Sequence, residues 1–237
     1  MTEGRRYLSF GGGVNSTALM LLLLDWGIEF EAVYADHGAD WPETRDYVAM
    51  LKERGYPITV LETRRAGLPL YDYYLKYQLL PIRWMRHCTS AYKVKPLKAY
   101  FQKPCVTYLG IDAGEPHRGT PSRVEDEERE YPLVDEGIDR KGCEDIIKGH
   151  GLPIPRKSGC FVCPFQRVGQ WKELLTRHPD LYCKARALEE AANRRITAGG
   201  KPPIYLSNTG RPLSAVAMED QLDLFGERTP GFCLCEL

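Results

Sequence analysis

The chain has 237 residues, 43% of them hydrophobic, and its 32 Lys and Arg side chains balance 32 Asp and Glu side chains. This length can bury one α/β core with a small appendage, and no apolar run approaches the roughly 20 residues of a membrane span. A net charge of zero gives no argument for a nucleic-acid partner, although it leaves room for local basic patches. The N-terminus lacks the apolar run of a signal peptide, so we expect a cytoplasmic protein whose eight cysteines stay reduced.

Strand-like and helix-like segments alternate in the first half of the chain. The predicted strands are residues 7–10, 30–35, 58–61 and 106–110, and the predicted helices are residues 16–26, 42–54 and 89–101. Asn15 or Ser16 is suited to cap the first helix. Strands separated by helices indicate right-handed βαβ crossovers, and hence a doubly wound, mainly parallel sheet.

The second half has a different pattern. Residues 118–129 are charged and read as a loop, residues 139–150 as a short helix, and residues 166–192 as two helices that break near Pro179. Residues 151–164 are rich in Gly, Pro and Cys. The simplest organisation is an α/β domain over residues 1–135 and a C-terminal helical, cysteine-bearing extension over residues 136–237.

A glycine-rich turn, SFGGGVNST at residues 9–17, joins the first strand to the first helix. A helix N-terminus after such a turn favours an anion, because backbone N–H groups point outward and glycines permit close approach. The patterns GxxxxGK[ST] and GxGxxG are both absent. From these residues alone, a tight structural turn is as good an interpretation as a phosphate site.

The turn resembles SxSGGxDS, the pyrophosphate-binding loop of N-type ATP pyrophosphatases (PP-loop proteins), which also opens the phosphoadenosine phosphosulfate (PAPS) reductase family. Gly12, Gly13, Ser16 and Thr17 match this pattern. Three substitutions leave the loop uncharged: Gly11 replaces a serine, Val14 the usual lysine and Asn15 the aspartate.

Three further segments resemble motifs of the same family, in the same order. Residues 34–44 are similar to DTGxxFPET, residues 86–97 to R-x-C-T followed by K-x-x-P-L, and residues 110–118 to G-x-R-x-x-E-S-x-x-R. The resemblance therefore covers about residues 5–165. It implies an adenine nucleotide alpha hydrolase-like, Rossmann-like fold.

The resemblance also implies an activity. A substrate oxygen would attack the α-phosphorus of ATP, giving an adenylated intermediate and pyrophosphate. Asp36 and Asp40 would contact Mg²⁺ or ribose and Arg118 would clamp a phosphate, although both aspartates could be ordinary turn residues. The implied nucleotide-binding residues are Ser9, Gly11, Gly12, Gly13, Asn15, Ser16, Thr17, Ala35, Gly110 and Arg123.

The unit Cys160-Phe161-Val162-Cys163-Pro164 is a CxxC followed by proline. Such a pair can belong to an iron–sulfur site, a redox pair or half of a zinc site. The family resemblance favours a [4Fe–4S] cluster on Cys88, Cys143, Cys160 and Cys163, a layout similar to the ATP pyrophosphatase proteins of DNA phosphorothioation systems. Three cysteines with an open iron, a buried apolar Cys143, and zinc are the alternatives.

These expectations lead to an ATP-consuming enzyme that transfers sulfur to an activated acceptor. The resemblance implies a nucleic acid as acceptor, a sulfur donor such as a cysteine desulfurase, and a homodimer or a complex with system partners. Residues 83–87, with Lys93, Lys95 and Lys98, could contact a phosphate backbone, or form an ordinary solvated face.

Two other functions stay open. One is reduction of PAPS or adenylyl sulfate, for which the family's ECGxH tail is missing and Cys233 and Cys235 would have to substitute. The other is a non-catalytic nucleotide- or DNA-binding subunit, which Val14 and Asn15 favour.

Overall fold

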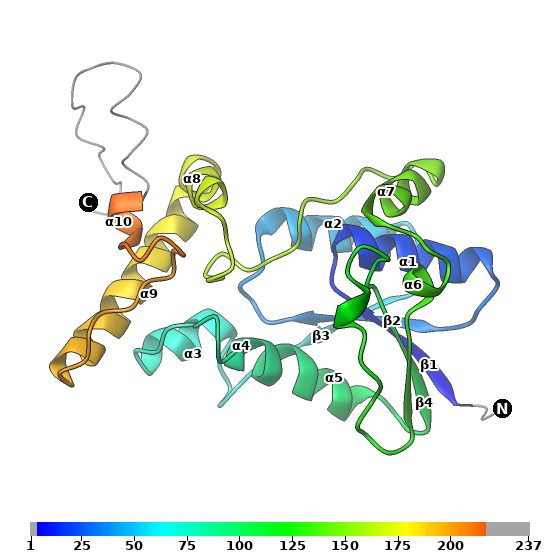
Figure 1. Ribbon diagram of the computed structural model, residues 1–237, viewed down its shortest axis with the longest axis horizontal. Helices are drawn as coiled ribbons and strands as arrows, with labels where there is room; N and C mark the ends of the chain where they lie inside the picture. The colour runs from blue at the N-terminus through cyan, green and yellow to red at the C-terminus, as the bar shows by residue number, and fades with distance from the viewer. Residues whose placement is uncertain (1–3, 217–237) are drawn as a thin grey trace. The chain divides into compact units, whose positions relative to one another are not determined.

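A computed structural model describes residues 4–216, and within it the chain forms two compact units (Figure 1). Residues 4–63 and 91–159 make the first, here called the sheet unit, and residues 64–90 and 160–216 make the second, the helical unit. This division differs from the predicted boundary at residue 135. Residues 136–159 belong to the sheet unit because α7 (Arg140–Gly149) packs on α1 (Val14–Asp25). Residues 64–90 belong to the helical unit because α3 (Leu70–Lys76) packs on α9 (Pro179–Ala198).

The sheet unit is built on five parallel strands in the order β3-β2-β1-β4-β5. Their bounds are β1 Arg5–Phe10, β2 Glu31–Asp36, β3 Ile58–Glu62, β4 Cys105–Leu109 and β5 Glu127–Glu130. The first four strands were predicted from the sequence, and the parallel α/β class is confirmed.

The fifth strand falls in the segment that we predicted to be a loop. β5 reads Glu-Glu-Arg-Glu and lies at the edge of the sheet beside β4, with Cys105 opposite Glu127. An edge strand has one free side and tolerates charged side chains, which also discourage pairing with another chain. Its composition therefore hid it from a search for apolar periodicity.

Helices cover both faces of the sheet, as the alternation of side chains along the strands requires. On β1, Leu8 packs in a core cluster with α1, α2 (Pro42–Glu53) and α7, while the adjacent Tyr7 packs in a second cluster with Leu97 and Phe101. The first cluster includes almost the whole apolar run of α1. This helix is therefore held firmly over the sheet, with its N-terminus at the ends of the strands.

The predicted helix at residues 89–101 is realised in pieces. They are α4 (His87–Thr89), the π-helix η1 (Ser90–Val94) and α5 (Lys95–Tyr100), with Pro96 accommodated in the first turn of α5. Two short elements complete the sheet unit: the 3₁₀ turn η2 (Pro116–Arg118) and α6 (Pro132–Asp135).

The helical unit consists of α3, α4, α8 (Val168–Arg177), α9 and α10 (Leu213–Val216). The break predicted near Pro179 is confirmed, since α8 ends at Arg177 and α9 begins at Pro179. Buried Glu189 on α9 accepts hydrogen bonds from the N–H groups of Leu206 and Leu213, and so fixes the segment after α9. Within residues 4–216 no helix has both the length and the apolar content that crossing a membrane requires.

Candidate nucleotide site

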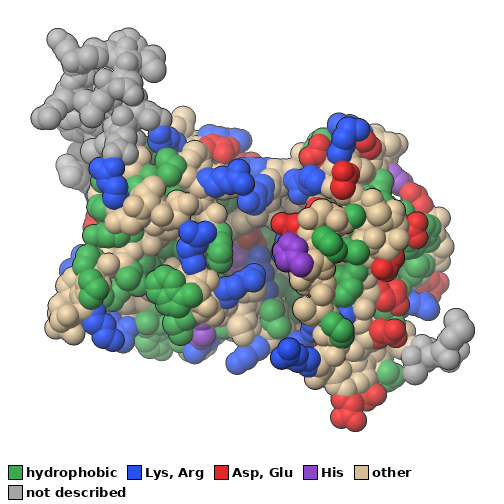
Figure 2. Space-filling model, viewed as in Figure 1, with side chains coloured by type: hydrophobic (Ala, Val, Ile, Leu, Met, Phe, Trp, Pro, Cys, Tyr) green, Lys and Arg blue, Asp and Glu red, His purple; other side chains and the backbone are tan. Residues whose placement is uncertain are grey.

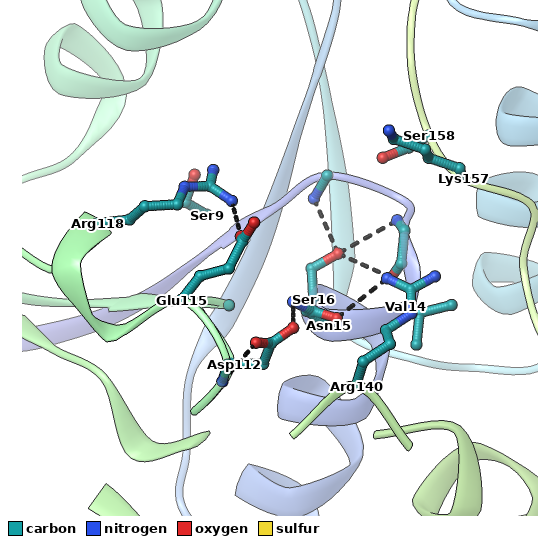
Figure 3. A pocket seen from close by; sticks show the side chains of 14 residues that line it. Ser9, Val14, Asn15, Ser16, Asp112, Glu115, Arg118, Arg140, Lys157 and Ser158 are labelled. Carbon is teal, nitrogen blue, oxygen red and sulfur yellow. Dashed lines mark hydrogen bonds and ion pairs between the residues drawn. The ribbon is translucent and has the colours of Figure 1, made fainter. Parts of the chain in front are cut away.

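A pocket of about 800 Å³ opens at the carboxyl ends of β1 and β4, entirely within the sheet unit (Figure 3). The ends of parallel strands, where helices begin, are the usual ligand-binding edge of such a fold. The glycine-rich turn, the loop after β4, the start of α7 and the segment before the CxxC supply its walls. The lining residues are Ser9, Gly11, Gly13, Val14, Asn15, Ser16, Gly110, Asp112, Gly114, Glu115, Arg118, Arg140, Lys157 and Ser158.

The glycine-rich turn is shaped by its neighbours. Gly12 has φ +65°, in the left-handed region, and an added Cβ would meet Thr44 and Val48 of α2 at 3.0 Å. A Cβ on Gly13 would stand 2.7 Å from the hydroxyl of Ser158. Gly12 is therefore favoured by its positive φ and by close approach, whereas a side chain at Gly13 would displace the Ser158 hydroxyl. Gly12, one of the predicted nucleotide-binding residues, faces α2 and does not line the pocket.

Backbone N–H groups of the turn converge on one point. Those of Gly11 and Gly13 donate to Ser16 Oγ at 3.2 and 3.3 Å. Helix α1 begins at Val14 with Gly13 as its N-cap, so Asn15 and Ser16 lie inside the first turn. The prediction that Asn15 or Ser16 caps this helix is therefore wrong. The first N–H groups of a helix have no intrahelical acceptors. The pocket thus has the donors and the positive dipole end that bind an anion.

Thr17 has a structural role in this arrangement. Its side chain is buried and its hydroxyl donates to the Gly13 carbonyl at 2.9 Å, which closes the first turn of α1. It does not line the pocket, so the predicted contact of this hydroxyl with a ligand is not seen in the described geometry. Ser16, one position earlier, does line it.

The loop after β4 lies directly on the start of α1. A Cβ on Gly110 would come within 2.9 Å of Ser16 N and 3.1 Å of Asn15 C. Because both atoms are backbone, no side-chain movement can relieve the contact. Gly110 therefore lets the loop bring the buried carboxylate of Asp112 beside the glycine-rich turn.

Asn15 links this carboxylate to a cation. Its amide nitrogen donates to Asp112 Oδ2 at 2.7 Å, and its amide oxygen accepts from Arg140 Nη1 at 3.2 Å (Figure 3). Gly114 N–H donates to the other oxygen, Asp112 Oδ1, at 2.9 Å. Position 15 thus carries an amide, and Asp112 places a carboxylate within hydrogen-bonding distance of it.

Three cations line the pocket, although the glycine-rich turn carries none. Arg118 forms an ion pair with Glu115 on one side, and Lys157 lies on the other side next to Ser158 (Figure 3). Arg140 is the third. Of these, the sequence predicted only Arg118; the other predicted arginine, Arg123, is exposed and does not line the pocket.

A clamp outside the pocket holds the segment that carries Lys157. The N–H of Trp41 donates to the Gly159 carbonyl at 3.0 Å. The guanidinium carbon of Arg156 lies 3.3 Å from the centre of the Trp41 ring, and Arg156 also pairs with Glu43. This stacking fixes the backbone on either side of Lys157 and Ser158, and so holds both residues against the glycine-rich turn.

The predicted site residues at the end of β2 and in the turn after it do not line the pocket. Ala35 is buried in the second core cluster, and Asp36 accepts from Gly38 N–H at 2.8 Å and pairs with Arg45. Asp40 is buried, 2.5 Å from the Tyr34 hydroxyl that donates to it and 3.2 Å from His37 Nε2. All three residues were predicted to contact nucleotide or Mg²⁺; the described contacts instead place them in the local structure around β2.

Asp40 is ionised in this setting. Burial by itself raises the pKa of its carboxyl, but Lys93, at 3.8 Å, and His37 outweigh burial, so that the pKa lies well below its usual range. Burial and the adjacent Asp40 charge raise the pKa of the Tyr34 hydroxyl. Ala39 N–H donates to His37 Nδ1, which leaves Nε2 to carry the proton toward Asp40. The group is a structural anchor for the turn after β2.

The four cysteines predicted to bind a cluster lie in both units. Cys143, on α7, is fully buried in the first core cluster of the sheet unit, and this burial raises the pKa of its thiol to about 12. Cys88, Cys160 and Cys163 lie in the helical unit, all partly exposed. Burial, and to a smaller extent the neighbouring Cys163, raise the pKa of Cys88. No three His, Cys, Asp or Glu side chains within residues 4–216 are grouped as a metal site would require.

Comparisons with known proteins give the following likenesses. No protein-family model matches the chain. It is 24% identical over 196 residues to the uncharacterized protein MJ0973 of Methanocaldococcus jannaschii, covering 74% of this chain and 45% of that protein. It is 23% identical over 197 residues to MJ0066 of the same organism, covering 75% and 40%. The chain thus spans less than half the length of the curated relatives it matches.

Among solved structures, the chain is similar to a phosphoadenylyl-sulfate (PAPS) reductase from Candida auris in a phosphate complex. The TM-score is 0.49 and the sequence identity 12%, with 65% of this chain and 76% of that chain covered.

Proposed function

We propose that the sheet unit binds ATP and cleaves it to AMP and pyrophosphate, activating an acceptor by adenylation. One observation carries this proposal: the glycine-rich turn, the N-terminus of α1 and three cations meet in a single pocket at the carboxyl edge of a parallel sheet. A pyrophosphate group carries several negative charges in a small volume. It needs the convergence of backbone donors and side-chain cations that this pocket provides.

In this proposal Lys157 and Arg140 supply the counter-charge that Val14 does not. Both line the pocket with the turn, and Lys157 stands next to Ser158, whose hydroxyl lies against Gly13. Arg118 binds phosphate oxygens after exchanging its partner Glu115 for them. Attack of an acceptor oxygen on the α-phosphorus forms one P–O bond and breaks the bond to the bridging oxygen, so that pyrophosphate leaves on the side of the turn.

The pocket also suits Mg²⁺. This ion is commonly bound by one or two carboxylates together with phosphate oxygens, and rarely by a cage of protein ligands alone. Asp112 and Glu115 are the carboxylates that line the pocket, so we propose them as ligands in place of Asp36 and Asp40. The ion would neutralise charge that develops on the phosphates. Asp112 is held by Asn15 and Gly114, which leaves its position well defined.

The finer function follows from the family resemblance, with support from the cysteines of the helical unit. We propose that the activated acceptor then receives sulfur, as in DNA phosphorothioation. The persulfide of a donor such as a cysteine desulfurase, reduced by two electrons from a thiol reductant, supplies sulfide-level sulfur that forms a P–S bond while the P–O bond to the leaving AMP breaks. Cys88, Cys160 and Cys163 are the proposed holders of an iron–sulfur cluster with one open iron: they share one unit and Cys163 acts on the pKa of Cys88, although the described side chains are not grouped as a bound metal would require. The core position of Cys143 favours this three-cysteine arrangement over the four-cysteine one.

Product analysis tests the nucleotide chemistry. The protein, purified without oxygen, is incubated with ATP, Mg²⁺ and candidate acceptors, and AMP, ADP and pyrophosphate are quantified. Lys157→Ala and Arg118→Ala should each lower AMP formation by roughly 10- to 100-fold, since each removes a charged contact to phosphate. Arg123→Ala, which lies outside the pocket, is the matched control.

Other products would point elsewhere. ADP in place of AMP contradicts the proposal, and so does full activity in both pocket variants. Sulfite released from PAPS with a thiol reductant and without ATP would favour the reductase alternative. Its candidate nucleophiles, Cys233 and Cys235, lie outside the described residues.

Metal analysis tests the cluster. Iron and acid-labile sulfide should copurify with the wild-type chain, disappear in Cys163→Ala and persist in Cys143→Ala. One zinc ion per chain without sulfide would remove the cluster from the proposal. Loss of iron in a folded Cys143→Ala variant would restore the four-cysteine arrangement.

A further inference from the structure

The balanced charge of the whole chain conceals a strong separation between its two units. Residues 64–90 and 160–216 of the helical unit contain 14 Lys and Arg but five Asp and Glu. Residues 4–63 and 91–159 of the sheet unit contain 17 Lys and Arg and 21 Asp and Glu. On the face shown in Figure 2, blue side chains prevail over red ones around α3, α8 and α9. The helical unit is therefore a basic body, which the total charge does not show.

One part of this unit combines exposed aromatic and apolar side chains with arginines. Trp84 is 75% exposed, Met85 63% and Phe165 48%, all unusually high for large apolar side chains. The guanidinium groups of Arg83 and Arg86 lie over the ring of Phe165, 5.2 and 5.9 Å from its centre. We call these five residues the arginine–aromatic surface. Its residues flank predicted cluster cysteines in sequence: Arg86 lies two positions before Cys88, and Phe165 lies two positions after Cys163.

The two arginines keep their charge available to a ligand. Neither forms an ion pair with a carboxylate within residues 4–216, and both are exposed. Arg83 and Arg86 are braced against one ring, so the intervening Trp84 and Met85 project from a short turn. Holding a guanidinium on an aromatic ring lowers the entropy that it loses when it binds an anion.

We infer that the arginine–aromatic surface binds single-stranded nucleic acid. Guanidinium groups match phosphate oxygens, and an exposed Trp beside them can stack on a base that is not paired. An acidic protein partner would use the charge but not the exposed indole in this way. As recognition of the acceptor for sulfur transfer, the inference rests on the proposed function; as nucleic-acid binding, it stands on these residues alone.

Fluorescence anisotropy tests the inference with the full chain. The probes are labelled oligonucleotides of roughly 20 nucleotides: single-stranded DNA, single-stranded RNA and duplex DNA, at about 50 and about 200 mM salt. We expect both single strands to bind more tightly than the duplex. Trp84→Ala should weaken binding about tenfold or more, without changing the salt dependence. Changing Arg83 and Arg86 together to Gln should reduce the salt slope by about 1 to 2.

Matched controls come from the sheet unit. Trp26 at the end of α1 is 43% exposed and Arg54 is exposed, so Trp26→Ala and Arg54→Gln remove similar side chains from a non-basic body. The inference is overturned if no probe binds at low salt, if the duplex is preferred, or if Trp84→Ala and Trp26→Ala lose affinity equally.

The outcome is separable from that of the proposed function. The surface variants should retain nucleotide binding in the absence of an acceptor, because none of their residues lines the pocket. If ATP gives no AMP yet oligonucleotides bind in a Trp84-dependent way, the proposed function fails and the inference stands. The reverse pattern, AMP formation without any Trp84-dependent binding, overturns the inference alone.

Discussion

Asn15 joins an acid to a cation at the floor of the pocket, between Asp112 and Arg140. An amide suits this place because it can donate to the carboxylate and accept from the guanidinium at the same time. An aspartate at this position would leave two carboxylates within hydrogen-bonding distance of each other. Asn15 is therefore compatible with Asp112 in physical terms, whereas an aspartate would repel it.

Restoring the aspartate should therefore destabilise the protein. In Asn15→Asp, repulsion with Asp112 raises the pKa of one carboxyl in the folded state, so the protonated form is favoured at acidic pH. Folding loses stability as the pH rises through that raised value, at a cost of about 1–3 kcal/mol near neutrality. Thermal unfolding of the variant and wild type should differ more at pH 8 than at pH 4.5. For Asn15→Ala, which adds no charge, the difference in unfolding temperature from the wild type should be nearly independent of pH.

The buried thiol of Cys143 leads to a prediction about how stability depends on pH. Its pKa of about 12 in the folded state exceeds the ordinary value of 9.0 because the thiol is buried. The unfolded chain therefore ionises first, and the stability that the neutral thiol provides is lost as pH rises from about 9 toward 12. The free energy of unfolding, measured by urea titration, should fall more between pH 8 and pH 10.5 for the wild type than for Cys143→Ala. An equal decrease in the two proteins would show that the thiol is accessible in the folded state.

At the scale of elements, the contact between the β4 loop and α1 depends on Gly110. In Gly110→Ala the new Cβ would lie 2.9 Å from Ser16 N and 3.0 Å from Ser16 Cα, so one of the two elements must shift. We expect a loss of about 1–3 kcal/mol in the free energy of unfolding and weaker nucleotide binding. Gly11→Ala is the control for stability, because its Cβ would meet only Ser16 Oγ at 3.8 Å. Equal urea midpoints for the two variants would contradict this account.

Elements with an apolar period were predictable from the sequence, whereas contacts between distant elements were not. The strands at residues 7–10 and 106–110 are recognisable because buried apolar residues precede a turn. β5 lacks that signal because it is charged and lies at an edge. The packing of α7 on α1 leaves no trace in local composition, so the unit boundary could not be placed.

The residues of the candidate site also fall into those that the sequence predicted and those that only the fold brings together. The glycine-rich turn was noticed because its glycines constrain the backbone locally, whereas Gly110 was assigned from the resemblance of residues 110–118 to a family motif. Arg140 reaches Asn15 across 125 positions, a separation that only the fold can close. Arg156-Lys157-Ser158-Gly159 did carry a signal, since it is a basic segment with a glycine directly before the CxxC. Asp36 and Asp40 were assigned from the resemblance of residues 34–44 to DTGxxFPET, and in the structure their side chains contact local partners.

At the scale of the whole molecule, the pocket belongs to one unit alone. A ligand that binds the folded sheet unit stabilises it by about 2.7 kcal/mol at 100 times its dissociation constant. Hydrogen exchange with ATP and Mg²⁺ should therefore slow in α1, β4 and α7. Amides of α9 should exchange as they do without ligand. Equal protection in α9 would show that the two units unfold together.

The interleaving of the two units has a consequence during synthesis. Residues 64–90 leave the ribosome before β4 and α7, yet the rest of their unit begins only at residue 160. At about 5–20 residues per second, this segment waits several seconds with Leu70 and Tyr74, which are buried in the folded unit, still uncovered. The sheet unit can fold first, and residues 64–90 then form a loop between its two sequence segments. A nascent chain halted near residue 159 therefore presents a finished sheet and a bare apolar segment, which is the form that a chaperone binds.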